Sequence, residues 1–163
     1  MIAWIGPNSS IIRRARRFAK KAHAGQKRKY TGDPYFNHCE AVAMLVADRG
    51  GSSEMIAAAY LHDVVEDTEV ELHDVMVEFG NPVGSYVHQL TDQYTPEAYP
   101  GWNRAKRKEA EANRYRYISN GAKIIKLCDL IDNTHSIVDH DPGYAVMYLQ
   151  EKVAVLKALG YGK

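Results

Sequence analysis

The sequence predicts an all-α fold, a single compact bundle of about seven to eight helices, because apolar residues recur at helical spacing almost everywhere. No segment competes seriously as a strand. The chain has 163 residues, which is enough for one domain with a substantial core. Its composition, with 45% hydrophobic and 25% charged residues, is that of an ordinary globular protein. We therefore expect residues 1–163 to form one domain.

The N-terminal half divides into five predicted helices separated by turn residues. Ser9 or Ser10 is expected to cap the first helix, and Gly25 to end it. Residues 26–36 then form a loop, since Thr31–Pro34 is turn sequence, and this loop could form a small hairpin at most. The next four helices are expected over residues 37–50, 52–67, 71–79 and 82–91.

The C-terminal half begins with a loop over residues 93–101, which holds two prolines and is expected to be a mobile cover. Asn103 and Asp141 suit helix N-caps, and Pro142 suits a first helical position. No internal repeat or low-complexity tract is present. The last three helices are expected over residues 103–118, 123–138 and 142–159.

The charges are segregated, although the net charge is only +1. Nine basic residues and no acidic residue lie from Arg13 to Lys29, whereas residues 66–78 contain six acidic residues and no lysine or arginine. A basic segment beside an acidic one suits a metal enzyme that acts on a polyanion. Two solvated helix faces explain the same pattern equally well.

The two cysteines, Cys39 and Cys128, form neither a disulfide framework nor a CxxC zinc motif, and we interpret both as buried apolar residues. No apolar run approaches the length of about 20 residues that a membrane span requires. Met1–Ile5 is apolar but too short for a signal peptide, and the charges follow it. A cytoplasmic location is therefore the expectation.

The segment that carries chemistry is centred on the adjacent pair His62 and Asp63. Neighbouring residues of a helix point about 100° apart, so both side chains can reach one metal ion. Glu66 and Asp67 lie three and four residues beyond Asp63 and therefore share its face. Crowded carboxylates repel one another and are costly to bury unless a cation neutralises them, which predicts a metal ion here.

Two further segments supply what this cluster lacks. His38 lies at the start of a predicted helix, after Pro34 and Tyr35. Asp129 lies inside an otherwise apolar helix, with Asn133 one turn later, and a charge in such surroundings needs a partner. Each segment alone is a weak signal. Together, on three helices, they predict one site.

These segments resemble the HD superfamily, and most closely the hydrolase domain of RelA/SpoT proteins and the small alarmone hydrolases, including metazoan SpoT homologues. The resemblance covers about residues 13–157 and implies an HD-domain bundle. The segments that carry it are Phe18-Ala19 through His23, Gly25–Lys29, Gly32–Tyr35, His38, His62–Thr68, Phe79-Gly80 and Lys126–Asp129.

The resemblance implies a role for each matching residue. One divalent ion, most often Mn²⁺, is bound in this family, here by His38, His62, Asp63 and Asp129. Activation of water and proton movement fall to Glu66 and Asp67. The residues implied to contact the substrate are Arg28, Lys29 and Asn133. The family reaction removes pyrophosphate from the 3′ position of guanosine 3′,5′-bis(diphosphate), ppGpp.

The sequence departs from the alarmone hydrolases after Asp129, where they commonly have a basic residue next and an arginine six positions on. Leu130 and His135 occupy these positions here, and Asp132 adds a negative charge. Two potential phosphate contacts are thus missing or weakened. This keeps open a hydrolase of the same type that acts on another nucleotide, such as a nucleoside monophosphate or NADPH.

The expected partner is therefore a phosphorylated nucleotide, and a homo-oligomer stays open. A third interpretation is a non-catalytic nucleotide- or RNA-binding protein that uses the basic segment from Arg13 to Lys29. Proteins that bind single-stranded nucleic acids combine positive charge with stacking aromatic residues. Phe18 and Tyr30 are sparse for that purpose, so the sequence disfavours a nucleic acid partner.

Overall fold

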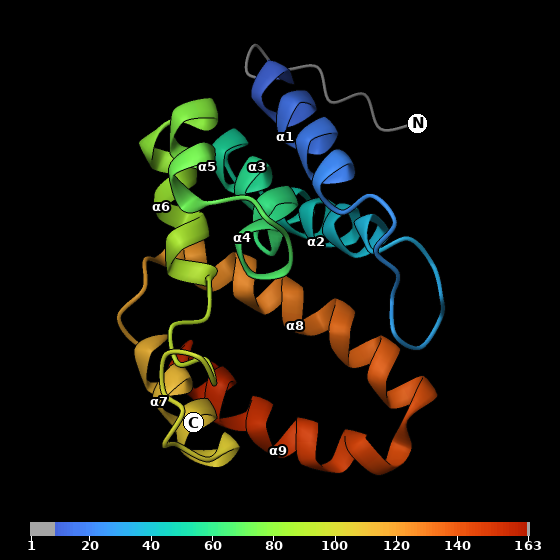
Figure 1. Ribbon diagram of the computed structural model, residues 1–163, viewed down its shortest axis with the longest axis vertical. Helices are drawn as coiled ribbons and strands as arrows, with labels where there is room; N and C mark the ends of the chain where they lie inside the picture. The colour runs from blue at the N-terminus through green and yellow to red at the C-terminus, as the bar shows by residue number, and fades with distance from the viewer. Residues whose placement is uncertain (1–8, 163) are drawn as a thin grey trace.

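A computed structural model describes residues 9–162, apart from the side chain of Ser9. The Met1–Ile5 segment and the predicted Ser9 cap therefore lie outside the described part. The all-α class is confirmed, with nine helices among the described residues (Figure 1). The bounds are α1 Ser9–Ala22, α2 Phe36–Asp48, α3 Ser53–Leu61, α4 Val64–Asp67, α5 Leu72–Phe79, α6 Asn81–Leu90, α7 Arg104–Arg114, α8 Asn120–His140 and α9 Pro142–Ala158.

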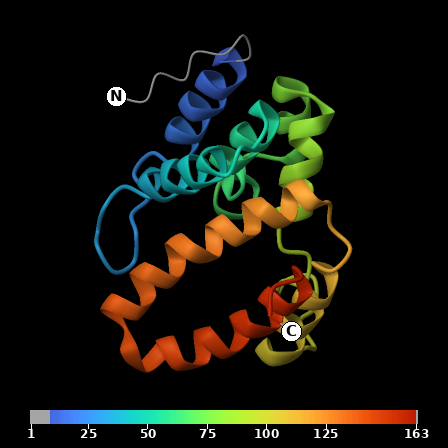
Figure 2. The same cartoon turned by 180° about the vertical axis from the view of Figure 1, so that it is seen from behind.

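Helix α3 forms the centre of the N-terminal layer, and every residue from Met55 to Leu61 is buried. Helices α1, α2 and α6 pack against it, and α5 packs against α6. The long helix α8 crosses beneath this layer in contact with α2, α3 and α6 (Figures 1 and 2). Helix α9 runs back along α8, and α7 packs on α9. The space between the N-terminal layer and α8 is where the predicted site residues meet.

One predicted helix is broken at a place that matters for the site. The expected helix over residues 52–67 ends at Leu61, and a separate single turn, α4, follows from Val64 to Asp67. Asp63 joins the two with φ −105° and ψ −1°. This break raises the helix number above the seven to eight that the periodicity indicates. Glu66 and Asp67 therefore belong to α4 and not to α3.

Side-chain caps explain where four of the helices begin, and two of these caps, Asn103 and Asp141, are those that the sequence predicts. The N-cap side chains that accept a backbone N–H bond are Ser52, Asn103, Ser119 and Asp141. Helix α2 differs from the prediction, since it begins at Phe36 and Asn37 lies in its first turn. The loop before α2 contains a single isolated antiparallel bridge between Lys27 and Pro34. At the place of the possible hairpin the structure therefore has one bridge and no paired strands.

The loop over residues 93–101 is held from two sides. Tyr94 stacks on Trp102 with ring centroids 5.8 Å apart, and Tyr99 contacts both rings. The buried carboxylate of Glu111 accepts hydrogen bonds from the backbone N–H groups of Gln93 and Tyr94 at 2.9 and 3.0 Å.

Within the described part of the chain, no helix is long and apolar enough to cross a membrane.

Candidate metal centre

Three helical segments bring the four predicted ligands together. His38 is in the first turn of α2, His62 and Asp63 form the break between α3 and α4, and Asp129 lies near the middle of α8. The packing of α2 and α3 on α8 places these residues around one point. One ligand atom from each of His38, His62 and Asp129 lies within 4.8 Å of the other two, and all three side chains are buried.

The distances describe a set of atoms that converge without bonding well to one another. His38 Nε2 lies 3.2 Å from Asp129 Oδ1 and 3.6 Å from Asp63 Oδ2. His62 Nε2 lies 3.0 Å from Asp63 Oδ2 and 3.6 Å from Asp129 Oδ1. Both Nε2 atoms are buried and lack a well-oriented hydrogen-bond partner among the described residues. Two imidazoles and two carboxylates in this arrangement fit a divalent ion with positions left for water and substrate.

The other ring nitrogen of each histidine is hydrogen-bonded. His62 Nδ1 donates to the backbone oxygen of Ala59 at 2.7 Å. His38 Nδ1 donates to Asp132 Oδ2 at 2.6 Å. A proton on Nδ1 leaves the lone pair of the neutral ring on Nε2, which is the atom that faces the other candidate ligands.

The electrostatics of the centre favour positive charge. Burial lowers the pKa of His38, but the neighbouring carboxylates of Asp129, Asp132 and Asp63 outweigh it and raise that pKa to about 10. Burial raises the pKa of Asp129, yet Lys126 and the two histidines hold it well below its usual range. The Lys126 ammonium donates to Asp129 Oδ2 at 2.9 Å. The site thus stabilises ionised carboxylates, which a divalent cation requires.

The predicted proton-transfer pair lies beside the ligands on the single turn α4. Glu66 reaches solvent, yet its partial burial and the nearby carboxylates of Asp92 and Asp63 raise its pKa to about 8. Partial burial and Asp63 also raise the pKa of Asp67, whose Oδ2 accepts a bond from Gln26. Elevated carboxyl pKa values suit groups that exchange protons near neutral pH.

The predicted substrate residues are only partly brought together. Arg28 donates to Asn133 Oδ1 at 3.1 Å and to Asp132 Oδ2 at 3.2 Å. Asn133 in turn donates to Asp129 Oδ1 at 2.7 Å, so it contacts a candidate ligand directly. Lys29 is separate from this group, with its ammonium 5.0 Å from the ring centroid of Tyr30.

Asp132 adds a negative charge beside the site, as the sequence indicates, but this charge is compensated. In the structure its carboxylate is paired with Arg28 and His38, and these partners hold its pKa below the usual range despite partial burial. The sequence could not reveal these partners, because they lie 104 and 94 residues earlier in the chain.

Two further side chains at the centre were not singled out by the sequence. Tyr35 donates its hydroxyl to Asp63 Oδ2, and Lys126 bonds to Asp129. Both occur inside segments that carried the family resemblance, so their presence there was the available signal. Their hydrogen bonds hold the carboxylates of Asp63 and Asp129 in place.

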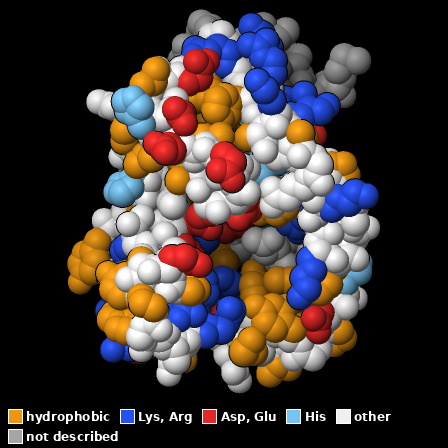
Figure 3. Space-filling model, viewed as in Figure 1, with side chains coloured by type: hydrophobic (Ala, Val, Ile, Leu, Met, Phe, Trp, Pro, Cys, Tyr) orange, Lys and Arg blue, Asp and Glu red, His pale blue; other side chains and the backbone are white. Residues whose placement is uncertain are grey.

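The surface is hollowed on two sides of the centre. A cavity of ≈ 430 Å³ is lined by Glu66 and Asp67 together with three cations of α7, namely Arg104, Arg107 and Lys108. Figure 3 shows acidic side chains gathered at the middle of this face, beside a hollow with basic side chains below. A second cavity of ≈ 290 Å³ is lined by Arg28, His38 and His135.

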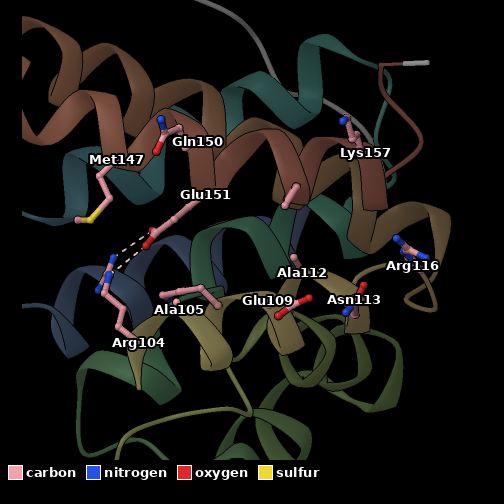
Figure 4. A pocket seen from close by; sticks show the side chains of 12 residues that line it. Arg104, Ala105, Glu109, Ala112, Asn113, Arg116, Met147, Gln150, Glu151 and Lys157 are labelled. Carbon is pink, nitrogen blue, oxygen red and sulfur yellow. Dashed lines mark hydrogen bonds and ion pairs between the residues drawn. The ribbon is translucent and has the colours of Figure 1, made fainter. Parts of the chain in front are cut away.

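A larger groove lies elsewhere, between α7 and α9. Its volume is ≈ 660 Å³, and an Arg104–Glu151 ion pair crosses one end (Figure 4). None of the predicted site residues lines it. The groove is therefore not where the convergent donors lie, although it is the more spacious.

Known proteins resemble this chain in both sequence and fold. A model of the HD domain family matches residues 15–159. The guanosine-3′,5′-bis(diphosphate) 3′-pyrophosphohydrolase MESH1 of Homo sapiens is 32% identical over 136 residues, which are 82% of this chain and 73% of that protein. The corresponding enzyme of Aquifex aeolicus is 34% identical, over 77% of this chain but only 18% of its own length.

A solved structure agrees with these sequence matches. It is described as a metazoan orthologue of SpoT that hydrolyses ppGpp, and it superimposes with a TM-score of 0.81 and 26% sequence identity over 97% of this chain and 88% of its own. A Listeria monocytogenes structure matches with a TM-score of 0.66 and 26% identity, over 82% of this chain and 85% of its own. With the matched HD model spanning most of its length, the chain belongs to the HD domain family of metal-dependent phosphohydrolases.

Proposed function

We propose that this chain is a Mn²⁺-dependent pyrophosphohydrolase that converts ppGpp to GDP and pyrophosphate. One observation carries the proposal, which is the pair of buried, unpartnered Nε2 atoms facing two carboxylates. The ppGpp hydrolases among the relatives supply the substrate class. We further propose that residues 1–163 form one HD domain with its core over about 13–157.

In this proposal His38, His62, Asp63 and Asp129 hold the ion. A bound Mn²⁺ acidifies water and polarises a phosphoryl oxygen. Oxygen and nitrogen donors of mixed type suit Mn²⁺ and similar ions better than a closed thiolate site would. Tyr35 and Asn133 orient the carboxylates of Asp63 and Asp129 by donating to them.

The environments of Glu66 and Asp67 divide the proton transfers between them. With a pKa near 8, Glu66 carries a proton at neutral pH and can donate it to the ribose 3′ oxygen as the bond to phosphorus breaks. Asp67, where a hydrogen bond from Gln26 opposes the upward shift of the pKa, can accept the proton of the attacking water. Two carboxyl groups in different environments are a common basis for acid and base roles.

The substrate then spans the two cavities. Arg28, which donates to Asn133, borders the cavity that reaches His135, and three cations of α7 border the other. Cations at these positions offset the charge of the phosphates. These cations lie outside the segment after Asp129, where this chain lacks the basic residues of the family pattern.

The test is a substrate panel with the purified chain and Mn²⁺, containing ppGpp, nucleoside monophosphates and NADPH, with products separated by ion-exchange chromatography. We expect pyrophosphate and GDP from ppGpp as the preferred reaction. Faster hydrolysis of a monophosphate or of NADPH would contradict the assignment of ppGpp as the substrate. The broader assignment as a phosphohydrolase would then still hold.

Hydrolysis of another nucleotide is the second candidate, and His135 is the observation that favours it. This exposed histidine stands where related enzymes have an arginine, and it lines the same cavity as Arg28. The RNA-binding alternative has lost support, because Phe18 packs edge-on against Phe79 with centroids 5.4 Å apart. A base stacking on Phe18 would have to displace that contact.

A further inference from the structure

The two candidate histidine ligands differ in what holds them. His62 donates its Nδ1 proton to Ala59, a backbone oxygen three residues earlier. His38 donates to the Asp132 carboxylate, which belongs to α8 and lies 94 residues later in the chain. A charged acceptor makes the stronger hydrogen bond, so the orientation of His38 depends on a side chain from another helix.

Burial also restricts the orientation of the His38 ring. Its side chain is fully buried, and its Nε2 atom lies 3.2 Å from Asp129 Oδ1 without a well-oriented hydrogen bond. Asp132 occupies the Nδ1 side of the ring, whereas the candidate metal position lies on the Nε2 side. Asp132 therefore contacts the ligand without being placed to serve as a ligand itself.

Asp132 is in turn fixed by Arg28. One guanidinium nitrogen donates to Asp132 at 3.2 Å, and another donates to Asn133 at 3.1 Å. Since Asn133 bonds to Asp129, the two ends of the Arg28 fork reach two different candidate ligands through one residue each. The guanidinium also compensates the charge of the Asp132 carboxylate.

We propose that Asp132 is a positioning residue for the metal centre, which holds His38 in the tautomer that presents Nε2 and thereby strengthens metal binding. The inference rests on the metal site proposed above. Carboxylates that accept the second N–H of a metal-binding histidine orient the ring and raise its basicity, and losing them typically weakens metal affinity by about 10- to 100-fold. Asp132 thus supports His38 as a metal-binding residue.

The first test measures Mn²⁺ affinity by titration calorimetry of the full chain at one fixed pH. We expect Asp132→Ala to bind on the order of 10- to 100-fold more weakly than wild type. Asp132→Asn should fall between them, because its amide oxygen still accepts the Nδ1 proton but carries no charge. Asp48→Ala, which removes an exposed carboxylate at the far end of α2, is the matched control and should leave affinity unchanged.

The second test reads the tautomer by NMR in ¹⁵N-labelled wild-type protein loaded with Zn²⁺ as a diamagnetic probe. We expect His38 and His62 to carry their protons on Nδ1, and the His38 signal alone to change in Asp132→Ala. If Asp132→Ala does not fold, the nearly isosteric Asp132→Asn carries the test, and a Mn²⁺ affinity equal to that of wild type in this variant overturns the inference.

The outcomes separate the two proposals. Absence of Mn²⁺ binding by wild type would remove the metal site itself, and the inference with it. Wild-type binding that Asp132→Ala matches within about threefold would refute only the positioning role, since the expected loss is at least tenfold. Strong binding and a clear Asp132 effect without ppGpp hydrolysis would leave the inference standing and refute the substrate.

Discussion

Replacing Asp129 with alanine should remove the metal and also destabilise the fold, for two separable reasons. Asp129 contributes a candidate ligand oxygen that faces both Nε2 atoms. It is also the ion-pair partner of Lys126, whose ammonium lies 2.9 Å away. The side chains of Lys126 and Asp129 are only 15% and 7% exposed, so the substitution leaves the lysine with a buried charge that has lost its ion-pair partner.

The magnitude follows from that burial. Breaking a buried ion pair by removing one partner costs about 3–5 kcal/mol, whereas replacing both partners with apolar groups is often neutral. Asp129→Ala should therefore lower the free energy of unfolding by roughly 3–5 kcal/mol. Adding Lys126→Met should recover most of that loss. Neither variant should bind Mn²⁺ or turn over substrate.

Urea unfolding followed by circular dichroism gives the stability, and titration calorimetry gives the Mn²⁺ affinity of the same samples. The double variant is the informative one, because it separates loss of the ligand from loss of the fold. Full Mn²⁺ occupancy in a folded Asp129→Ala or His62→Ala variant would refute the assignment of the site. A change in stability below about 1 kcal/mol would refute the ion-pair argument.

Three further predictions concern proton transfer, substrate binding and a buried lysine. Glu66→Gln and Asp67→Asn should retain Mn²⁺ yet slow turnover by on the order of 100-fold, and activity within about threefold of wild type would exclude both as proton carriers. Arg28→Ala should raise KM more than it lowers kcat in steady-state assays, because it removes binding remote from the bond that breaks. Burial and Lys126 lower the pKa of Lys152 to about 8, so its charged form destabilises the fold fully below pH 8 and not at all above its ordinary pKa of 10.5. Lys152→Met should therefore raise Tm at pH 7, with an advantage that shrinks as Tm is measured at increasing pH.

The local pattern of the sequence predicts where a cation is needed, whereas the family resemblance implies which four residues would bind it. Asp129 interrupts an apolar helix, and His62 follows a run in which every residue from Met55 to Leu61 is buried. Burying charge in such surroundings is costly unless a partner compensates it, so the sequence alone signals the need for a cation. The predicted helix class and most caps follow equally from local pattern.

The break at Asp63 could not be predicted from periodicity. Apolar spacing continues from α3 through Val64 and Val65 into α4, as it would in one unbroken helix. Asp63 instead bonds to Tyr35, a residue 28 positions earlier, and lies 3.0 Å from His62 Nε2. The local backbone thus follows contacts between distant segments, which a one-dimensional pattern does not contain.

Leu130 is a second residue whose role depends on packing that the sequence pattern does not contain. In the sequence it stands where related hydrolases have a basic residue, and we interpreted it as a lost phosphate contact. In the structure Leu130 is only 4% exposed and belongs to the hydrophobic core. A lysine in that orientation would bury an ammonium without a partner, which is costly. Leu130 is therefore a packing residue in this chain, and its replacement by lysine is a poor test of substrate choice.

His135 is the position at which substrate choice can be tested. It is exposed and shares a cavity with Arg28, so His135→Arg adds a permanent cation beside the proposed nucleotide without disturbing the core. If charge at this edge selects for phosphate number, kcat/KM should rise more for ppGpp than for a nucleoside monophosphate. Equal changes for both substrates would show that the departure from the family pattern at His135 is neutral, and that the cations of α7 and Arg28 already meet the charge of the substrate.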